Sequence, residues 1–158
     1  MFSDANRQGL SRALGRYIVA VPMRKVTEVQ REVLARPGRY REVATNLRVK
    51  EVWVGEGERR RRYVVCHNPD EAERAQAHRE RLVQLVRAEL AALDVRQADH
   101  PKRACELMAS RRFGRYLRMD ARGRLSLDTA KVAAEAKYDG KFVVTTNDDT
   151  LEAEDVAL

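Results

Sequence analysis

Residues 135–147 read Glu-Ala-Lys-Tyr-Asp-Gly-Lys-Phe-Val-Val-Thr-Thr-Asn, and this stretch decides the expected fold. Its first four residues are typical of the end of a helix. Asp139-Gly140 predicts a turn, because glycine accepts a positive φ and aspartate bonds its own backbone. Lys141 to Thr146 has the composition of a buried strand. The acidic stretch that follows resembles the start of another helix. Because the chain stops inside that helix, we expect a piece of a longer protein.

A second apolar run lies near the other end of the chain. Tyr17-Ile-Val-Ala-Val21 is stopped by Pro22 and shows no polar alternation, which is typical of a parallel strand buried on both faces. We expect it to be a neighbour of the 142–146 strand in one core sheet. Helices are expected at 3–14, with Ser3 or Asp4 as the cap, and at 25–35.

The middle of the chain predicts a small antiparallel sheet and then several helices. Strands are expected at 40–47, 48–55 and 58–67, the last two joined by a Gly55-Glu-Gly57 turn. Asn68 is the expected cap of a long charged helix that runs to about residue 93. Beyond it the sequence predicts a helix at 101–110, a hairpin of 116–119 with 124–127, and a helix capped by Asp128 that ends near residue 138.

The charge balance favours a polyanionic partner. The chain has 158 residues, 35% of them charged, and a formal net charge of +7. That charged share exceeds the roughly 25% of ordinary globular domains, and the excess is mostly arginine. Nucleic acid is the first partner that such a balance indicates. The alternative is an arginine-rich soluble domain whose arginines have no binding role.

Cysteine usage and hydropathy indicate the compartment. Cys66 and Cys105 lie far apart and form no Cys-x-x-Cys pair, so neither a zinc site nor a disulfide framework is expected. No apolar stretch reaches the 18 residues of a membrane span, and the first residues lack the order of a signal peptide. We therefore expect a cytoplasmic protein with reduced thiols and no membrane partner.

Four segments, in their order and spacing, resemble insertion-sequence transposases of the DD-E class. The segments are Ser3-Asp-Ala-Asn6 leading into Gly15-Arg-Tyr-Ile-Val-Ala-Val21, then Tyr63-Val-Val-Cys-His-Asn-Pro69, then Phe113-Gly-Arg-Tyr-Leu117, and last Tyr138-Asp-Gly-Lys-Phe-Val-Val-Thr-Thr-Asn147. Each is weak alone, and together they span nearly the whole chain. This family has an RNase H-like catalytic fold that a β-rich insertion interrupts before the last catalytic acid.

The resemblance implies an α/β (α+β) fold in a single domain of residues 1–158. Residues 1–35 and 128–158 would be parts of an RNase H-like core at both ends of the chain. Residues 36–127 would form the insertion region, with its β-rich part and the long helix.

The resemblance also implies DNA transposition chemistry that this chain does not complete alone. In the family, three carboxylates hold two divalent metals, Mg²⁺, which activate water and then a DNA 3′-hydroxyl. The second acid would lie a few residues before Met1, the first further upstream, and the third beyond Leu158 in a Tyr-x2-Arg-x3-Glu-x6-Lys pattern. We therefore expect no catalytic residue, metal ligand or cofactor in this chain. Asp4 and Asp139 are the nearest substitutes, but a helix cap and a turn already explain them.

Arginines are the expected DNA contacts, and they form two sets. The first set is the run of four arginines at 59–62. In a strand, only two of the four would share a face, and protection of a sheet edge by charge explains this run as well. The second set crowds the second hairpin and is the better candidate. The residues are Arg59, Arg60, Arg61 and Arg62, and then Arg111, Arg112, Arg115, Arg118, Arg122 and Arg124.

Two aromatic residues, Trp53 and Tyr63, are candidates for a stacking surface. Trp53 and Tyr63 could stack on a base, although core packing is the more frequent role. Trp53 breaks the valine alternation and is expected to face away from Val52 and Val54.

The main hypothesis is a transposase fragment, inactive alone, that keeps a DNA- or partner-binding surface. The alternatives are a stand-alone basic nucleic-acid-binding module and an inhibitor that binds full-length transposase.

Overall fold

The chain forms two compact units with mixed α+β structure. The computed structural model describes residues 3–12, 15–95 and 100–158. One unit, called the sheet unit below, consists of residues 1–72 and 140–158. The other, called the hairpin unit, consists of residues 73–139. These boundaries differ from the expected segments 1–35, 36–127 and 128–158, because the middle strands share a sheet with strands from both ends of the chain.

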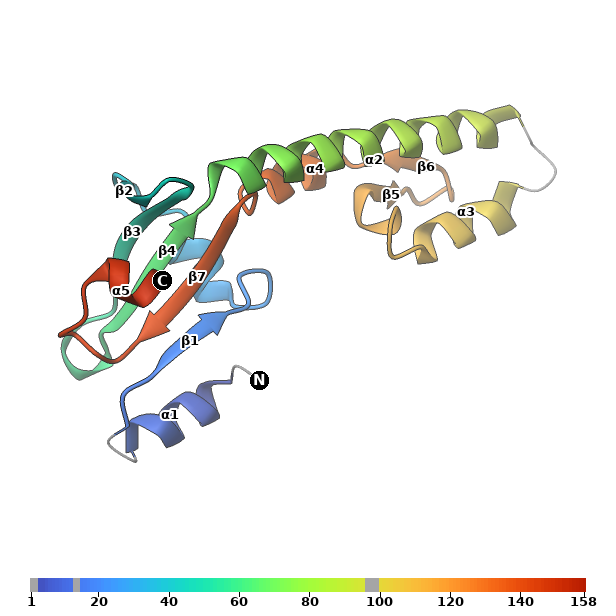
Figure 1. The fold of residues 1–158 in the computed structure, drawn as a ribbon. Coiled ribbons are helices and arrows are strands. Elements are labelled where there is room, and N and C mark those ends of the chain that lie inside the picture. The colour runs from blue at the N-terminus through green and yellow to red at the C-terminus, as the bar shows by residue number, and fades with distance from the viewer. Residues whose placement is uncertain (1–2, 13–14, 96–99) are drawn as a thin grey trace. The chain divides into compact units, whose positions relative to one another are not determined.

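A five-stranded antiparallel sheet organises the sheet unit, in the order β1-β7-β4-β3-β2 (Figure 1). Its strands are β1 (Ile18–Val21), β2 (Arg41–Ala44), β3 (Leu47–Val54), β4 (Arg61–His67) and β7 (Lys141–Thr146). The predicted neighbours β1 and β7 do pair, with Val19 opposite Thr145. The predicted antiparallel arrangement of β2, β3 and β4 is also confirmed, but within the larger sheet.

The prediction of a parallel strand at Tyr17–Val21, buried on both faces, is wrong. β1 runs antiparallel at the edge of the sheet. Val21 is buried, whereas Ile18 is 48% exposed. An apolar run this short fits a half-buried edge strand as well as a buried one, so composition alone could not separate the two.

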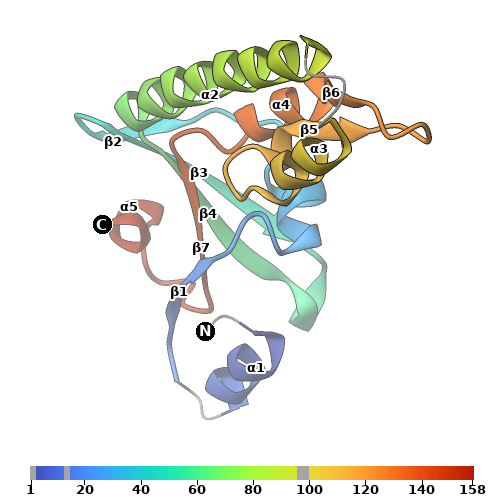
Figure 2. The ribbon, with the colours of Figure 1, turned by 90° about the vertical axis from the view of Figure 1, so that its right-hand side faces the viewer.

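Both faces of the sheet are covered, by different segments (Figure 2). On one face Val52, Tyr63 and Val143 pack with Val29 and Val33 of the π-helix η1 (Val29–Val33). On the other face Val64 and Val144 pack with residues of α5 (Ala153–Ala157). The helix expected at 25–35 therefore forms over a shorter range and contains a π turn, in which the N–H of Leu34 donates to the carbonyl of Val29 at 2.8 Å.

Helix caps and turns follow the sequence closely. Asn68 accepts the N–H of Glu71 and caps α2 (Pro69–Val95), and Asp128 accepts the N–H of Lys131 and caps α4 (Thr129–Ala136). Ser3 accepts the N–H of Asn6 and caps α1 (Asp4–Arg12); the side chain of Asp4, the other predicted cap, lies outside the described residues. The Asp139-Gly140 turn forms as predicted, with φ of +61° at Gly140.

The hairpin unit has a small core of its own. Val86 and Leu93 of α2, Leu107 of α3 (His100–Ala109) and Leu117 are buried together. The predicted hairpin forms from β5 (Leu117–Met119) and β6 (Leu125–Leu127), joined to α3 through the 3-10 turn η3 (Gly114–Tyr116). Among the described residues, no helix has the length and apolar character needed to cross a bilayer.

Candidate nucleic-acid interface

A groove of about 510 Å³ opens at one end of the sheet, and we call it the arginine groove. It lies where β4 begins and β7 ends. Residues of the 3-10 turn η2 (Gly57–Arg59), which connects β3 to β4, and residues of α1 line it as well. It is lined by Gln8, Arg12, Tyr17, Trp53, Gly57, Arg59, Arg60, Arg61, Arg62, Thr145, Thr146, Asn147 and Asp149. Of the described lining residues, five are arginines and one, Asp149, carries a carboxylate.

Side-chain hydrogen bonds fix the start of β1 against the end of β7 in this groove. Asn147 accepts the N–H of Tyr17 at 2.9 Å and donates to the carbonyl of Gly15 at 2.9 Å. The hydroxyl of Thr146 donates to the carbonyl of Tyr17 at 2.7 Å. Specific bonds between distant parts of the sequence thus fix the lining residues Tyr17, Thr146 and Asn147 relative to one another.

The four arginines of the first predicted set differ in what they contact. Arg59 is exposed. Arg60 places its guanidinium 4.0 Å from the centroid of the Trp53 ring, and it pairs with Asp149 at 3.4 Å. Arg61 pairs with Glu28 at 2.5 Å. The strand expected at 58–67 begins only at Arg61, because Gly57–Arg59 forms a 3-10 turn, so the predicted alternation applies to Arg61 and Arg62 alone.

Arg62 is a structural residue, and its surroundings exclude the predicted DNA contact. It is 5% exposed. Its guanidinium pairs with Glu51 at 3.1 Å and donates to the carbonyls of Asp148 at 2.9 Å and Leu151 at 2.7 Å. A buried guanidinium needs such partners, since its charge has lost the solvation of water. Its donors are therefore engaged by the protein itself.

The two candidate stacking residues also differ. Tyr63 is only 2% exposed, and its hydroxyl donates to Glu28 at 3.0 Å, so it cannot stack on a base. Burial, with the nearby Glu28 carboxylate, raises the pKa of Tyr63 to about 12. Trp53 is half-buried and lines the groove. As predicted, it faces away from Val52 and Val54, which lie in the core on the opposite face.

The second predicted set of arginines stays at the surface of the hairpin unit. Arg111, Arg112, Arg115, Arg118, Arg122 and Arg124 are all exposed. Within the part of the chain that the structure describes, none of the six forms an ion pair with a carboxylate. Arg112 and Arg115 lie over the rings of their neighbours Phe113 and Tyr116, at 5.2 and 4.9 Å from the ring centroids.

A single aspartate holds the turn of the arginine-rich hairpin. Asp120 Oδ1 accepts the N–H of Arg122 and the N–H of Arg124, both at 2.9 Å. Gly123 completes this turn with φ of +76°. Oxygen Oδ1 of Asp120 therefore engages two backbone donors. It is also the only acidic residue in 111–124, so this stretch presents a strongly positive surface.

Asp139, one of the two substitutes considered for a catalytic acid, and the buried Asp148 both have partners within the protein. Asp139 pairs with Arg79 at 2.5 Å, in agreement with a structural role in its turn. Asp148 is buried, and it accepts hydrogen bonds from the hydroxyl and the N–H of Thr150 and from Arg16. These bonds lower the pKa of Asp148, with those from Thr150 having the largest effect. Among the described residues, no three His, Cys, Asp or Glu side chains are grouped so that they could hold a metal ion.

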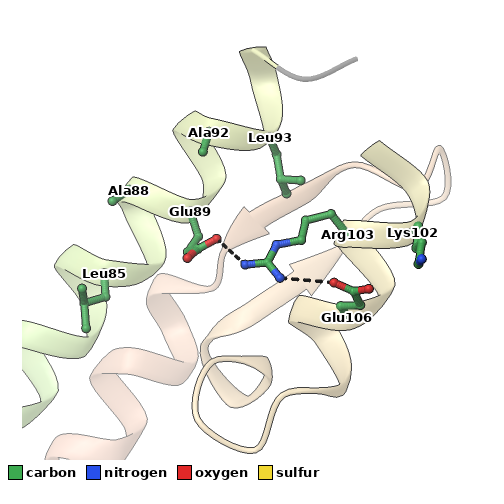
Figure 3. A pocket seen from close by; sticks show the side chains of 8 residues that line it. All are labelled: Leu85, Ala88, Glu89, Ala92, Leu93, Lys102, Arg103 and Glu106. Carbon is green, nitrogen blue, oxygen red and sulfur yellow. Dashed lines mark hydrogen bonds and ion pairs between the residues drawn. The ribbon is translucent and has the colours of Figure 1, made fainter. Parts of the chain in front are cut away.

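A second hollow, of about 600 Å³, lies between α2 and α3 of the hairpin unit (Figure 3). Its walls carry Leu85, Ala88, Ala92 and Leu93, and Arg103 crosses it. The Arg103 guanidinium pairs with Glu89 at 3.0 Å and with Glu106 at 3.2 Å. Both bonds raise the pKa of Arg103, and the bond to Glu89 ties the two helices together. A structural ion-pair network therefore crosses this hollow.

Eight lining residues of the arginine groove were not among the predicted contacts: Gln8, Arg12, Tyr17, Gly57, Thr145, Thr146, Asn147 and Asp149. Arg12 is the last residue of α1, far in sequence from the arginine run that it joins in space. Tyr17 and the Thr-Thr-Asn motif gave a signal, but it marked the resemblance rather than the groove. No family model, curated protein or solved structure matches the chain.

Proposed function

We propose that this chain belongs to the DD-E transposases and binds DNA, with the three catalytic acids of the family lying outside residues 1–158. The DNA-binding part of this proposal rests on residues 111–124, which lead into the β5–β6 hairpin and include its turn, and which we call the arginine-rich hairpin. Six exposed arginines occur in residues 111–124, and the single carboxylate among them, Asp120, is engaged by backbone N–H groups. Such a surface attracts a phosphate backbone strongly. The order of the four motifs supports the relation to transposases.

Salt dependence of duplex binding tests this function. Binding of the chain to a fluorescent DNA duplex is measured by anisotropy at several salt concentrations. Each phosphate that an arginine neutralises contributes about −0.9 to the slope of log K against log salt. Replacing Arg118, Arg122 and Arg124 together by glutamine is expected to make the slope less steep by about 2 to 3, and to weaken binding by a similar factor for every sequence.

The matched control removes the same charge elsewhere. Arg31, Arg39 and Arg87 are exposed and lie outside the hairpin. Their joint replacement by glutamine is expected to change the slope by less than about 1, because long-range attraction between exposed charges is screened. Equal losses in the two triple variants would show that only net charge matters, and would contradict a DNA surface on the hairpin.

The relation to transposases has its own test in the DNA that flanks the reading frame. We expect an aspartate codon within several residues upstream of Met1, and a Tyr-x2-Arg-x3-Glu-x6-Lys pattern downstream. If both flanks are unrelated to transposases, the stand-alone basic module becomes the better hypothesis. Binding to a full-length transposase from the same element, measured by co-purification, would favour the inhibitor.

A further inference from the structure

The arginine groove combines exposed cations with a flat stacking surface, and the proposed function does not explain this combination. The guanidinium of Arg60 lies on the face of Trp53, and the Arg60 side chain remains 50% exposed. An arginine held in this way is fixed by the aromatic ring. Arg62 also lies over this ring, 5.7 Å from its centroid, and the exposed half of Arg60 is the part that a ligand can reach. Nucleic-acid bases stack on aromatic rings and on guanidinium planes alike.

Cations from two different elements line the groove and fit the charge of a nucleic-acid backbone. Arg12 reaches the groove from α1 and Arg59 reaches it from η2, and both are exposed. Arg61 and Arg62 are less suitable, because Glu28 and Glu51 already pair with them. The backbone contacts therefore fall to Arg12 of α1 and Arg59 of η2.

Among the described residues that line the groove, Asp149 carries the one carboxylate, and it occupies a place where a phosphate would compete. Its distance to Arg60 is 3.4 Å, and both side chains are at least half exposed. An exposed pair of this kind is weak and easily exchanged for another anion. Asp149 therefore acts as a local competitor of the ligand, and its removal should help binding.

The dimensions of the groove favour one strand over two. Its volume of about 510 Å³ is that of an ordinary small-molecule pocket, enough for a nucleotide or two. A duplex presents its stacked bases inside two backbones and cannot place a base on the Arg60–Trp53 surface. A single strand can do so, and basic grooves with aromatic stacking surfaces are typical of single-strand binding.

We propose that the arginine groove binds single-stranded DNA, with a base stacked on Arg60 over Trp53 and phosphates on Arg12 and Arg59. The choice of DNA as the nucleic acid rests on the proposed function. The site is distinct in its residues from the arginine-rich hairpin, so the two surfaces can be tested separately.

Trp53 is the only tryptophan of the chain and is therefore a built-in reporter. The full chain is titrated with an oligothymidylate long enough to span the groove while tryptophan fluorescence is recorded. Binding is expected to quench this fluorescence. Arg60→Gln is expected to raise Kd roughly tenfold or more, in line with the loss of one stacked base, and Asp149→Asn is expected to lower Kd severalfold. Arg39→Gln, which removes an exposed charge outside the groove, is expected to leave Kd nearly unchanged.

The opposite effects of Arg60→Gln and Asp149→Asn separate binding from folding, since a misfolded variant does not bind more tightly. Circular dichroism of each variant verifies the fold. An unchanged Kd in Arg60→Gln, or oligothymidylate binding without quenching, would overturn the proposal. Quenching that a duplex of the same length produces with equal Kd would overturn it as well.

The two proposals fail in different ways. If the chain binds duplex DNA through the hairpin arginines but oligothymidylate neither quenches Trp53 nor depends on Arg60, the groove proposal alone is wrong. If oligothymidylate binding depends on Arg60 while duplex binding does not depend on Arg118, Arg122 and Arg124, the groove stands and the hairpin surface is wrong.

Discussion

Arg62 shows how one residue changes meaning between sequence and structure. In the run Arg59–Arg62 the four side chains are chemically identical, and nothing local distinguishes them. The register of β4 places Arg62 opposite Trp53, and its guanidinium lies beside Glu51. That guanidinium also bonds the carbonyls of Asp148 and Leu151 and holds the segment before α5. A charge that looked like a DNA contact is in fact part of the fold.

Replacing Arg62 by glutamine is expected to destabilise the chain by about 2–4 kcal/mol, because the carbonyls of Asp148 and Leu151 lose the buried donor that satisfies them. Glu51 adds less, since its side chain is 34% exposed and water replaces the lost partner. The free energy of unfolding is measured in urea with Trp53 fluorescence as the signal. Arg59→Gln is the control from the same run, and because Arg59 is exposed it is expected to change stability by less than about 0.5 kcal/mol. Equal effects of the two variants would contradict the structural role of Arg62.

At the scale of elements, the turn between α4 and β7 is closely packed against the start of α2. Gly140 has φ of +61°, and a Cβ there would lie 2.2 Å from the carbonyl oxygen of Asn68 and 2.6 Å from the nitrogen of Ala72. No side chain fits without movement of the start of α2. The glycine is thus required by its contacts as well as by its backbone angle.

Gly140→Ala is expected to cost about 2–4 kcal/mol, from the left-handed backbone together with the clash. Gly57→Ala is the matched control, because Gly57 has φ of +55° but a Cβ added there would meet no atom within 4 Å. It is expected to cost only about 1–2 kcal/mol, from the backbone alone. Urea unfolding of both variants checks the difference. A cost for Gly140→Ala no larger than that for Gly57→Ala would contradict the close approach.

Sequence patterns predicted the elements better than their neighbours in space. Caps at Asn68 and Asp128 and the Asp139-Gly140 turn were found because each depends on one or two residues and their own backbone. The edge position of β1 was missed, because it depends on which strands pair, and no short run carries that information. The arginine groove was only half predicted for the same reason, since α1 and the end of β7 join it from distant positions.

At the scale of the whole molecule, the two cysteines differ in what a solvent-borne reagent can reach. Cys66 is fully buried on β4, and burial raises its pKa to about 12. Cys105 is exposed on α3. Because the thiolate is the reactive form, Cys66 is both shielded and protonated in the folded chain.

A thiol reagent at mildly alkaline pH is therefore expected to modify Cys105 rapidly. It is expected to modify Cys66 only as the sheet unit opens. The slow rate, followed by absorbance with an aromatic disulfide, then measures the free energy of that opening. Cys105→Ser is expected to abolish the rapid phase and leave the slow one. Two rapid thiols in the native chain would show that β4 is not protected as described.

The backbone bond between Asn68 and Gly140 has a consequence for how the gene can vary. The N–H of Asn68 donates to the carbonyl of Gly140 at 2.8 Å, so the chain leaves the sheet unit and returns to it at the same point. The two ends of residues 73–139, the whole hairpin unit, therefore connect to neighbouring positions of the sheet unit. Recombination could lengthen, shorten or exchange that stretch while every strand of the sheet keeps its partner. The hairpin unit can therefore be replaced in evolution as one insertion, because none of its residues belongs to a strand of the five-stranded sheet.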